Sequence, residues 1–89
     1  MSNKLEIDDI TFAHGVQNIF SDGSDTVRRF RQAVDARFTV HDENGLLKIS
    51  GRREIWVPKG NVAFMIPMTA ERSKQLGPNP LEKAQEKGK

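Results

Sequence analysis

The sequence predicts a mainly β protein: a small, twisted antiparallel sheet of hairpins in meander order, followed by a flexible C-terminal tail. Two observations carry this prediction. The dipeptide Asn44-Gly45 stands between two strand-like runs, and two prolines each end a later run in which apolar residues alternate with others. We expect one domain over residues 1–68 and a polar, largely disordered tail over 69–89.

The first half of the chain predicts a strand pair around a turn. "ITFAHGVQNIF" (residues 10–20) precedes a turn cluster at 20–26, and "VRRFRQAV" follows it. For residues 27–36 the alternating phase continues into the next hairpin and favours a strand. The apolar spacing of Val27, Phe30 and Val34 leaves open an α+β alternative with one short helix around 26–36.

The central hairpin is the most specific signal, because Asn-Gly tolerates the positive φ angles of a two-residue turn. It predicts opposed pairs on the two strands of "ARFTVHDENGLLKISG". These pairs are Glu43–Leu46, His41–Lys48, Val40–Ile49, Thr39–Ser50 and Arg37–Arg52. Since side chains alternate across a strand, Phe38, Val40, Leu47 and Ile49 share the core face.

Two more strands, "REIWVP" and "NVAFMIP", follow and are ended by Pro58 and Pro67. Alternation places five residues of these strands in the core: Ile55, Val57, Val62, Phe64 and Ile66. The same alternation turns Trp56 outward. In the tail, a short helical turn near 70–76 would end at Gly77-Pro78.

The chain has 89 residues and no cysteine, so no disulfide can reinforce its small core. We therefore expect a homo-oligomer, a dimer or a tetramer. The polar start and the lack of a long apolar run predict no signal region and no membrane span, and hence a cytoplasmic protein.

Charge is segregated along the chain. Residues 1–25 carry one basic residue against five acidic ones, whereas residues 26–60 carry eight basic residues against four acidic ones. Six of those eight bases are arginines, which suit phosphate groups and flat rings. Complementary charge between the two segments predicts a contact between subunits.

The outward face of the sheet is the candidate site. Trp56 would lie among basic side chains, and an exposed ring flanked by cations is typical of single-stranded nucleic-acid surfaces. The competing interpretation places the single tryptophan in the core or at a subunit interface and leaves the arginines in water. The candidate nucleic-acid-binding residues are Arg29, Arg31, Arg37, Lys48, Arg52, Arg53 and Trp56.

Other chemistries find no support in the sequence. His14 and His41 lie on different elements without metal-ligand spacing, the glycines are isolated, and no serine has an evident activating base. We therefore expect no enzyme activity, no metal and no cofactor.

The order "ITFAHGVQNIF", "FTV…NGLLKISG" and "WVPKGNVAFMIP", over residues 10–68, resembles small early proteins of tailed bacteriophages. It looks most like the single-stranded-DNA-binding RNA polymerase cofactor (Drc) type. The resemblance implies an oligomeric, non-enzymatic DNA-binding protein of phage transcription or replication, in the host cytoplasm, with RNA polymerase as a candidate partner. It carries over no binding residues, and the tail departs from common single-stranded-DNA-binding proteins by ending in lysines instead of an acidic tip.

Two functions thus stand as hypotheses. The first is a single-stranded DNA-binding protein without base-specific readout, with RNA as an open alternative substrate. The second is a small phage adaptor or inhibitor of a host protein, which would use Trp56 and the acidic segment 1–25 as its contact.

Overall fold

The computed structural model describes residues 3–77, and the expectation of disorder for residues 78–89 lies outside this part. The mainly β class is confirmed, and the helix around 26–36 is wrong because a strand covers Thr26–Arg31. The elements are β1 (Asn3–Leu5), β2 (Ile7–Gln17), β3 (Thr26–Arg31), β4 (Thr39–Glu43), β5 (Leu46–Ser50), β6 (Glu54–Pro58), the 3-10 turn η1 (Lys59–Asn61), β7 (Val62–Pro67) and α1 (Ala70–Leu76).

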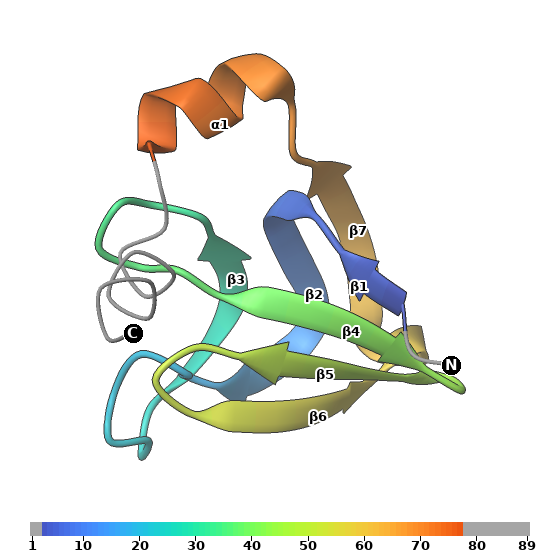
Figure 1. Ribbon diagram of the computed structural model, residues 1–89. Coiled ribbons are helices and arrows are strands. Elements are labelled where there is room, and N and C mark those ends of the chain that lie inside the picture. The colour runs from blue at the N-terminus through green and yellow to red at the C-terminus, as the bar shows by residue number, and fades with distance from the viewer. Residues whose placement is uncertain (1–2, 78–89) are drawn as a thin grey trace, which may run out of the picture.

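The strands form two antiparallel sheets (Figure 1). Sheet A has the order β1-β4-β5-β6, and sheet B has the order β3-β2-β7. The predicted meander is correct for β4, β5 and β6 and wrong for β7, which pairs with β2 in the other sheet. Pro58 lacks an N–H to extend a ladder, and η1 follows it directly, so the chain crosses from sheet A to sheet B between β6 and β7.

The central hairpin folds as predicted. Glu43 opposes Leu46, His41 opposes Lys48, and Thr39 opposes Ser50. Asn44 and Gly45 both adopt positive φ angles, 50° and 88°. This turn fixes the register, and the register decides which side chains of sheet A face outward.

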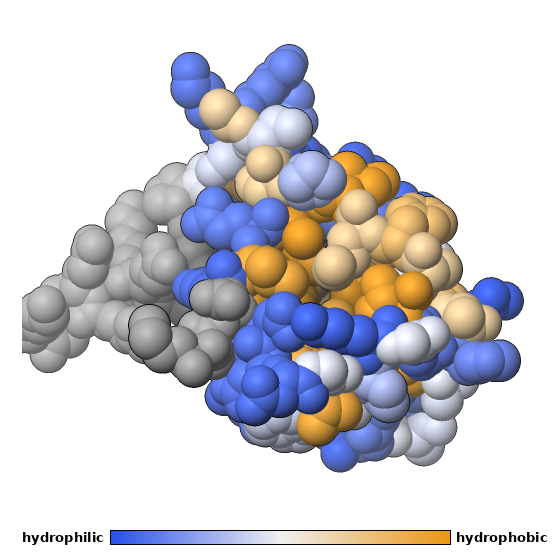
Figure 2. All heavy atoms as spheres, turned by 90° about the vertical axis from the view of Figure 1, so that its right-hand side faces the viewer, coloured by the Kyte–Doolittle hydropathy of each residue, from blue (hydrophilic) through white to orange (hydrophobic). Residues whose placement is uncertain are grey.

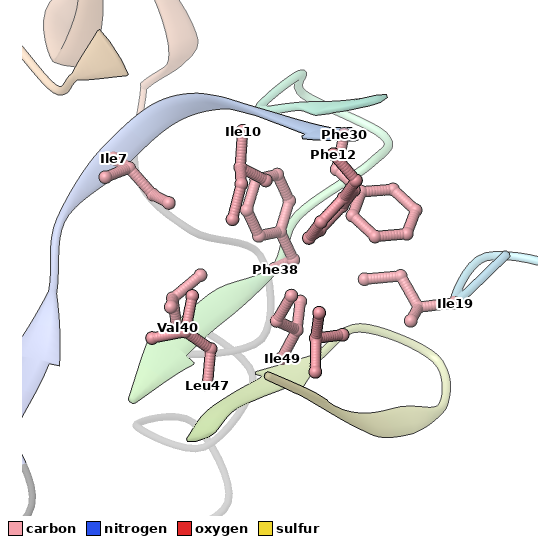
Figure 3. Packing of buried hydrophobic residues seen from close by; sticks show 10 residues of the cluster. Ile7, Ile10, Phe12, Ile19, Phe30, Phe38, Val40, Leu47 and Ile49 are labelled. Carbon is pink, nitrogen blue, oxygen red and sulfur yellow. The ribbon is translucent and has the colours of Figure 1, made fainter. Parts of the chain in front are cut away.

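The core lies between the inner faces of the two sheets (Figure 3). Phe12 and Phe30 of sheet B meet edge to face with ring centroids 5.6 Å apart, and Phe20 packs on Phe30 in the same way at 5.7 Å. Such contacts stabilise aromatic pairs beyond the area they bury. The buried cluster consists of Ile7, Ile10, Phe12, Ile19, Phe30, Phe38, Val40, Leu47, Ile49 and Val57.

For two residues the prediction of a core position is wrong. Phe64 and Ile66 are 54% and 45% exposed. The reason is a register shift between β2 and β7: Phe12 opposes Val62, but Thr11 opposes Phe64, so the pairing skips Ala63. This irregularity leaves Val62 packed against the core and turns the next apolar residues to the outside.

The chain between β3 and β4 bends where a continuous strand was predicted. An isolated bridge joins Ala33 to Ala36, and Val34 is exposed at the tip of this turn. The buried Gln32 fixes the bend, because its side chain donates to the carbonyl of Phe38 (2.6 Å) and accepts from its N–H (3.3 Å).

The helix expected near 70–76 is confirmed as α1, which extends the folded part beyond residue 68. The hydroxyl of Thr69 accepts a hydrogen bond from the N–H of Arg72, and Gly77 ends the helix at a positive φ of 76°. Leu76 is buried. No helix in the described range is long and apolar enough to cross a membrane.

The two turn glycines Gly45 and Gly60 allow the effect of backbone strain to be measured without a contribution from steric contacts. A Cβ at either position would meet no atom within 4 Å, but only Gly45 of the two has a positive φ. We expect Gly45→Ala to lower the free energy of unfolding by about 1–2 kcal/mol, the cost of a left-handed conformation. Gly60→Ala should stay within about 0.5 kcal/mol of the parent. Urea unfolding followed by circular dichroism measures both, and equal values would contradict the predicted turn strain.

Candidate nucleic-acid interface

One row of side chains crosses the outer face of sheet A. The pairings Lys4–His41, His41–Lys48 and Lys48–Trp56 connect all four strands, one residue from each. Directly opposed residues of antiparallel strands point to the same face. Since Leu47, Ile49 and Val57 point into the core, this row points away from it.

Trp56 stands at the β6 end of the row and is 49% exposed. The Nζ atom of Lys48 lies 5.9 Å from the centroid of its ring, within the range of a cation–π contact. The ring therefore offers surface for stacking beside a positive charge. The prediction that Trp56 faces outward next to Lys48 is confirmed.

Acidic side chains border this row. Glu54 is exposed and opposes Ser50 on the same face, with its carboxylate 3.9 Å from the Nζ of Lys48. Glu43 opposes Leu46 at the hairpin end. The face is thus a basic and aromatic row between acidic edges, and the charge on Glu54 offsets part of the charge on Lys48.

A shallow hollow adjoins Trp56 between β6 and the end of β2. Its lining includes the amide side chains of Gln17 and Asn61. The Asn61 side chain accepts from the His14 N–H (2.8 Å) and donates to the His14 carbonyl (3.3 Å), which fixes η1 against β2. The remaining lining residues are Val16, Glu54, Ile55, Trp56, Val57 and Pro58.

Arg52 and Arg53 lie in the turn between β5 and β6, against the loop that follows β2. Arg52 is exposed, and its Nη1 donates to the Phe20 carbonyl at 3.4 Å. Arg53 is half-buried beside Gly23, and its Nη1 has no hydrogen-bond partner among the described residues. Arg52 is therefore exposed beside the loop that follows β2, whereas Arg53 packs into that loop.

The loop beside these arginines is held by Asp25. Its carboxylate accepts from the hydroxyl of Ser21 (2.6 Å) and from the amide of Asn18 (2.9 Å), and these bonds lower the pKa of Asp25. Because the pKa of Asp25 is lower in the folded protein, its ionised carboxylate stabilises the folded loop at pH values above the ordinary pKa of the group. This support is lost as the pH falls through the lowered value.

Arg37 does not face Arg52, so this part of the predicted site is wrong. The β4–β5 ladder begins at Thr39–Ser50, after the chain has bent. The Nη2 of Arg37 instead donates to the carbonyls of Leu76 (2.9 Å) and Gly77 (3.1 Å). A cation at these free carbonyls stabilises the end of α1.

Arg29 and Arg31 lie on β3 in sheet B, so the structure does not bring them to the row on sheet A. Both are exposed. Arg29 forms an ion pair with Asp9, which is 2% exposed, and its Nε lies 2.9 Å from Oδ2. The hydrogen bond to Asp9 raises the pKa of Arg29.

The structure adds two residues that the predicted site lacked, Lys4 and His41. The hairpin register had paired His41 with Lys48 on the outer face, but its neighbour on the other side was not predicted. Lys4 supplies that neighbour, because β1 joins the sheet beside β4. The alternation of "NKLEI" was the available signal, since Leu5 packs against the core and Lys4 is exposed.

The acidic segment 1–25 is largely engaged within the chain. Asp9 pairs with Arg29, Asp8 accepts from the Nε of Arg72 at 3.0 Å, and Asp25 is held in its loop. Of these contacts only Asp9–Arg29 joins the acidic segment to the basic segment 26–60, and it lies within one subunit.

The described residues contain no group of three or more histidine, cysteine, aspartate or glutamate side chains placed to hold a metal ion. Comparisons of the chain with protein-family models, with curated proteins and with solved structures find no match.

The two arginines of β3 allow the Asp9 ion pair to be tested. Arg29→Met would leave the buried Asp9 carboxylate without its partner, and we expect it to lower the free energy of unfolding by about 2–3 kcal/mol. Arg31→Met removes an exposed arginine from the same strand and should cost less than about 0.5 kcal/mol. Chemical denaturation of both variants measures the difference, and equal costs would show that the pair contributes nothing to stability.

Proposed function

We propose that the protein binds single-stranded nucleic acid, DNA in the first place, on the outer face of sheet A and without base-specific readout. The observation that carries this proposal is the cross-strand row Lys4–His41–Lys48–Trp56, and the exposed Arg52 in the β5–β6 turn is a further candidate cation. A half-exposed ring accepts any base by stacking, and neighbouring cations neutralise phosphates. Arg29, Arg31, Arg37 and Arg53 take no direct part in this face.

The residues of the row have separable roles. Trp56 provides the stacking surface, and the hollow beside it gives the stacked base a neighbouring space. Lys48 lies close enough to Trp56 for one nucleotide to contact both, through its base and its phosphate. Lys4 and His41 continue the path across the sheet toward β1.

We further propose the setting that the phage resemblance implies, in which the protein serves transcription or replication in the host cytoplasm, with RNA polymerase as a candidate partner. The adaptor alternative has weaker support, because the acidic contact it requires is largely occupied. Asp8, Asp9 and Asp25 all have partners within the chain.

Stacking on Trp56 can be tested by adding labelled oligo-dT and oligo-U to the protein. We expect Trp56→Ala to weaken binding by about 1–3 kcal/mol, the usual range for one base–aromatic contact. Val34→Ala removes a similarly exposed apolar side chain from the turn between β3 and β4, outside the row, and should bind like the parent. Fluorescence anisotropy measures both. A folded Trp56→Ala protein with unchanged affinity for both oligonucleotides would refute the proposed site.

Removing the positive charge of Lys48 or the negative charge of Glu54, both close to Trp56, should change binding in opposite directions. Lys48→Gln should reduce the slope of log K against log salt by about one unit, as expected for one lost phosphate contact. Glu54→Gln removes the acid next to Lys48 and should strengthen binding at low salt. Lys74→Gln and Glu71→Gln on α1 are the matched controls and should change neither quantity. Equal effects of Lys48→Gln and Lys74→Gln would indicate binding through net charge alone.

A further inference from the structure

The strand β7 exposes apolar side chains on both of its faces. Phe64, Met65 and Ile66 are 54%, 39% and 45% exposed, and no residue of Val62–Pro67 is charged. Figure 2 views the molecule from the β7 side and shows apolar atoms gathered below α1, with hydrophilic side chains around them. This is the longest run of exposed large apolar side chains in the described residues.

The backbone of β7 is also unpartnered along one edge. In the described part of the chain β7 pairs with β2 alone and ends sheet B. Natural edge strands are usually protected by charges, by prolines, by β-bulges or by a covering segment. Of these devices β7 has the irregularity at Ala63 near its start and one proline, Pro67, at its last position, and between them Phe64–Ile66 carry no charge. An uncharged edge strand of this kind is a template for another strand.

We infer that β7 is a dimerisation strand, on which the β7 of a second copy of this chain pairs antiparallel. The joined sheet would have the order β3-β2-β7-β7-β2-β3, continuous across both subunits. This inference is independent of the proposed function, because β7 belongs to sheet B and contributes no residue to the row on sheet A.

Symmetry makes this strand complementary to itself. A two-fold axis perpendicular to the sheet relates two antiparallel strands and keeps each side chain on its own face. Phe64 and Ile66 oppose Thr11 and Asp9 of β2 and so share the outer face of sheet B. They would therefore lie beside the same two residues of the second copy, apolar against apolar.

The charges at the ends of β7 match the antiparallel direction. Lys59 precedes the strand, and its side chain is 48% exposed while it forms an ion pair with Asp42 (2.6 Å) of its own subunit. At the other end, Glu71 lies exposed in the first turn of α1, and the exposed Glu6 accepts from the Met68 N–H through its carbonyl (3.2 Å). Antiparallel pairing brings the basic end of each copy to the acidic end of the other, whereas parallel pairing would bring like charges together.

The exposed area sets the expected strength of this contact. An aromatic side chain offers roughly 150–250 Å² in total, so three half-exposed side chains amount to a few hundred Å² on each copy. This is below the approximately 800 Å² per partner of a standard interface. Backbone hydrogen bonds along the strand add to it, and we expect a dimer that dissociates in the micromolar range.

The test introduces opposite charges at Phe64, an outward position where a substitution does not change the core. Light scattering and sedimentation should show the parent shifting from the 10.0 kDa monomer to twice that mass as its concentration rises through the micromolar range. Phe64→Lys and Phe64→Glu should each remain monomeric, while Val34→Lys, at an exposed apolar site elsewhere, should dimerise like the parent. An equimolar mixture of the two Phe64 variants should regain a dimer that native mass spectrometry identifies as mixed.

Hydrogen exchange of the parent supplies a readout that needs no variant. Amide protection that rises with protein concentration should concentrate in β7. A parent that stays monomeric at millimolar concentration overturns the inference and leaves β7 for another partner or for residues 78–89. A dimer that persists in Phe64→Lys, or concentration-dependent protection centred outside β7, equally overturns it.

Discussion

The packing of β2, the central strand of sheet B, against sheet A is the constraint on which the rest of the structure depends. Ile10 and Phe12 of this strand are fully buried and meet the inner residues of sheet A across the core. In so short a chain each strand buries only one of its faces in that core. The inward face of β5 and β6 is therefore committed to Leu47, Ile49 and Val57, and the candidate site consists of what alternation leaves on the other side.

Pairing of charges inside the subunit shapes the remaining surface. The arginine-rich middle of the chain is not a uniform basic patch, because Arg29 neutralises the buried Asp9 and Arg37 binds the carbonyl end of α1. A buried carboxylate without a partner would be costly, so Arg29 serves stability first. Fewer arginines are free to meet a ligand than composition suggests, and on sheet A the basic side chains of Lys4 and Lys48 share one row with the Trp56 ring.

The sequence was sufficient wherever the structure follows from local rules. Asn44-Gly45 defines the hairpin register, and the register with simple alternation places Lys48 and Trp56 side by side on the outside. It was insufficient where pairing is decided over long distances. After η1 the chain enters sheet B, so β7 pairs with β2 and not with β6. The register shift at Ala63 then turns Phe64 outward, although simple alternation predicts that it is buried. Arg37 was misplaced for a related reason: its partners lie some forty residues away, at the end of a helix.

The outward position of Trp56 has a spectroscopic consequence. The chain has one tryptophan and no tyrosine, so ultraviolet emission excited near 295 nm comes from this single ring. Because the ring is already half in water in the native state, its emission maximum should move little when the chain unfolds. The same ring would be quenched by any aromatic group that stacks on it. The intrinsic fluorescence intensity of this protein should therefore report occupancy of the sheet face, whereas its emission maximum should change little on unfolding.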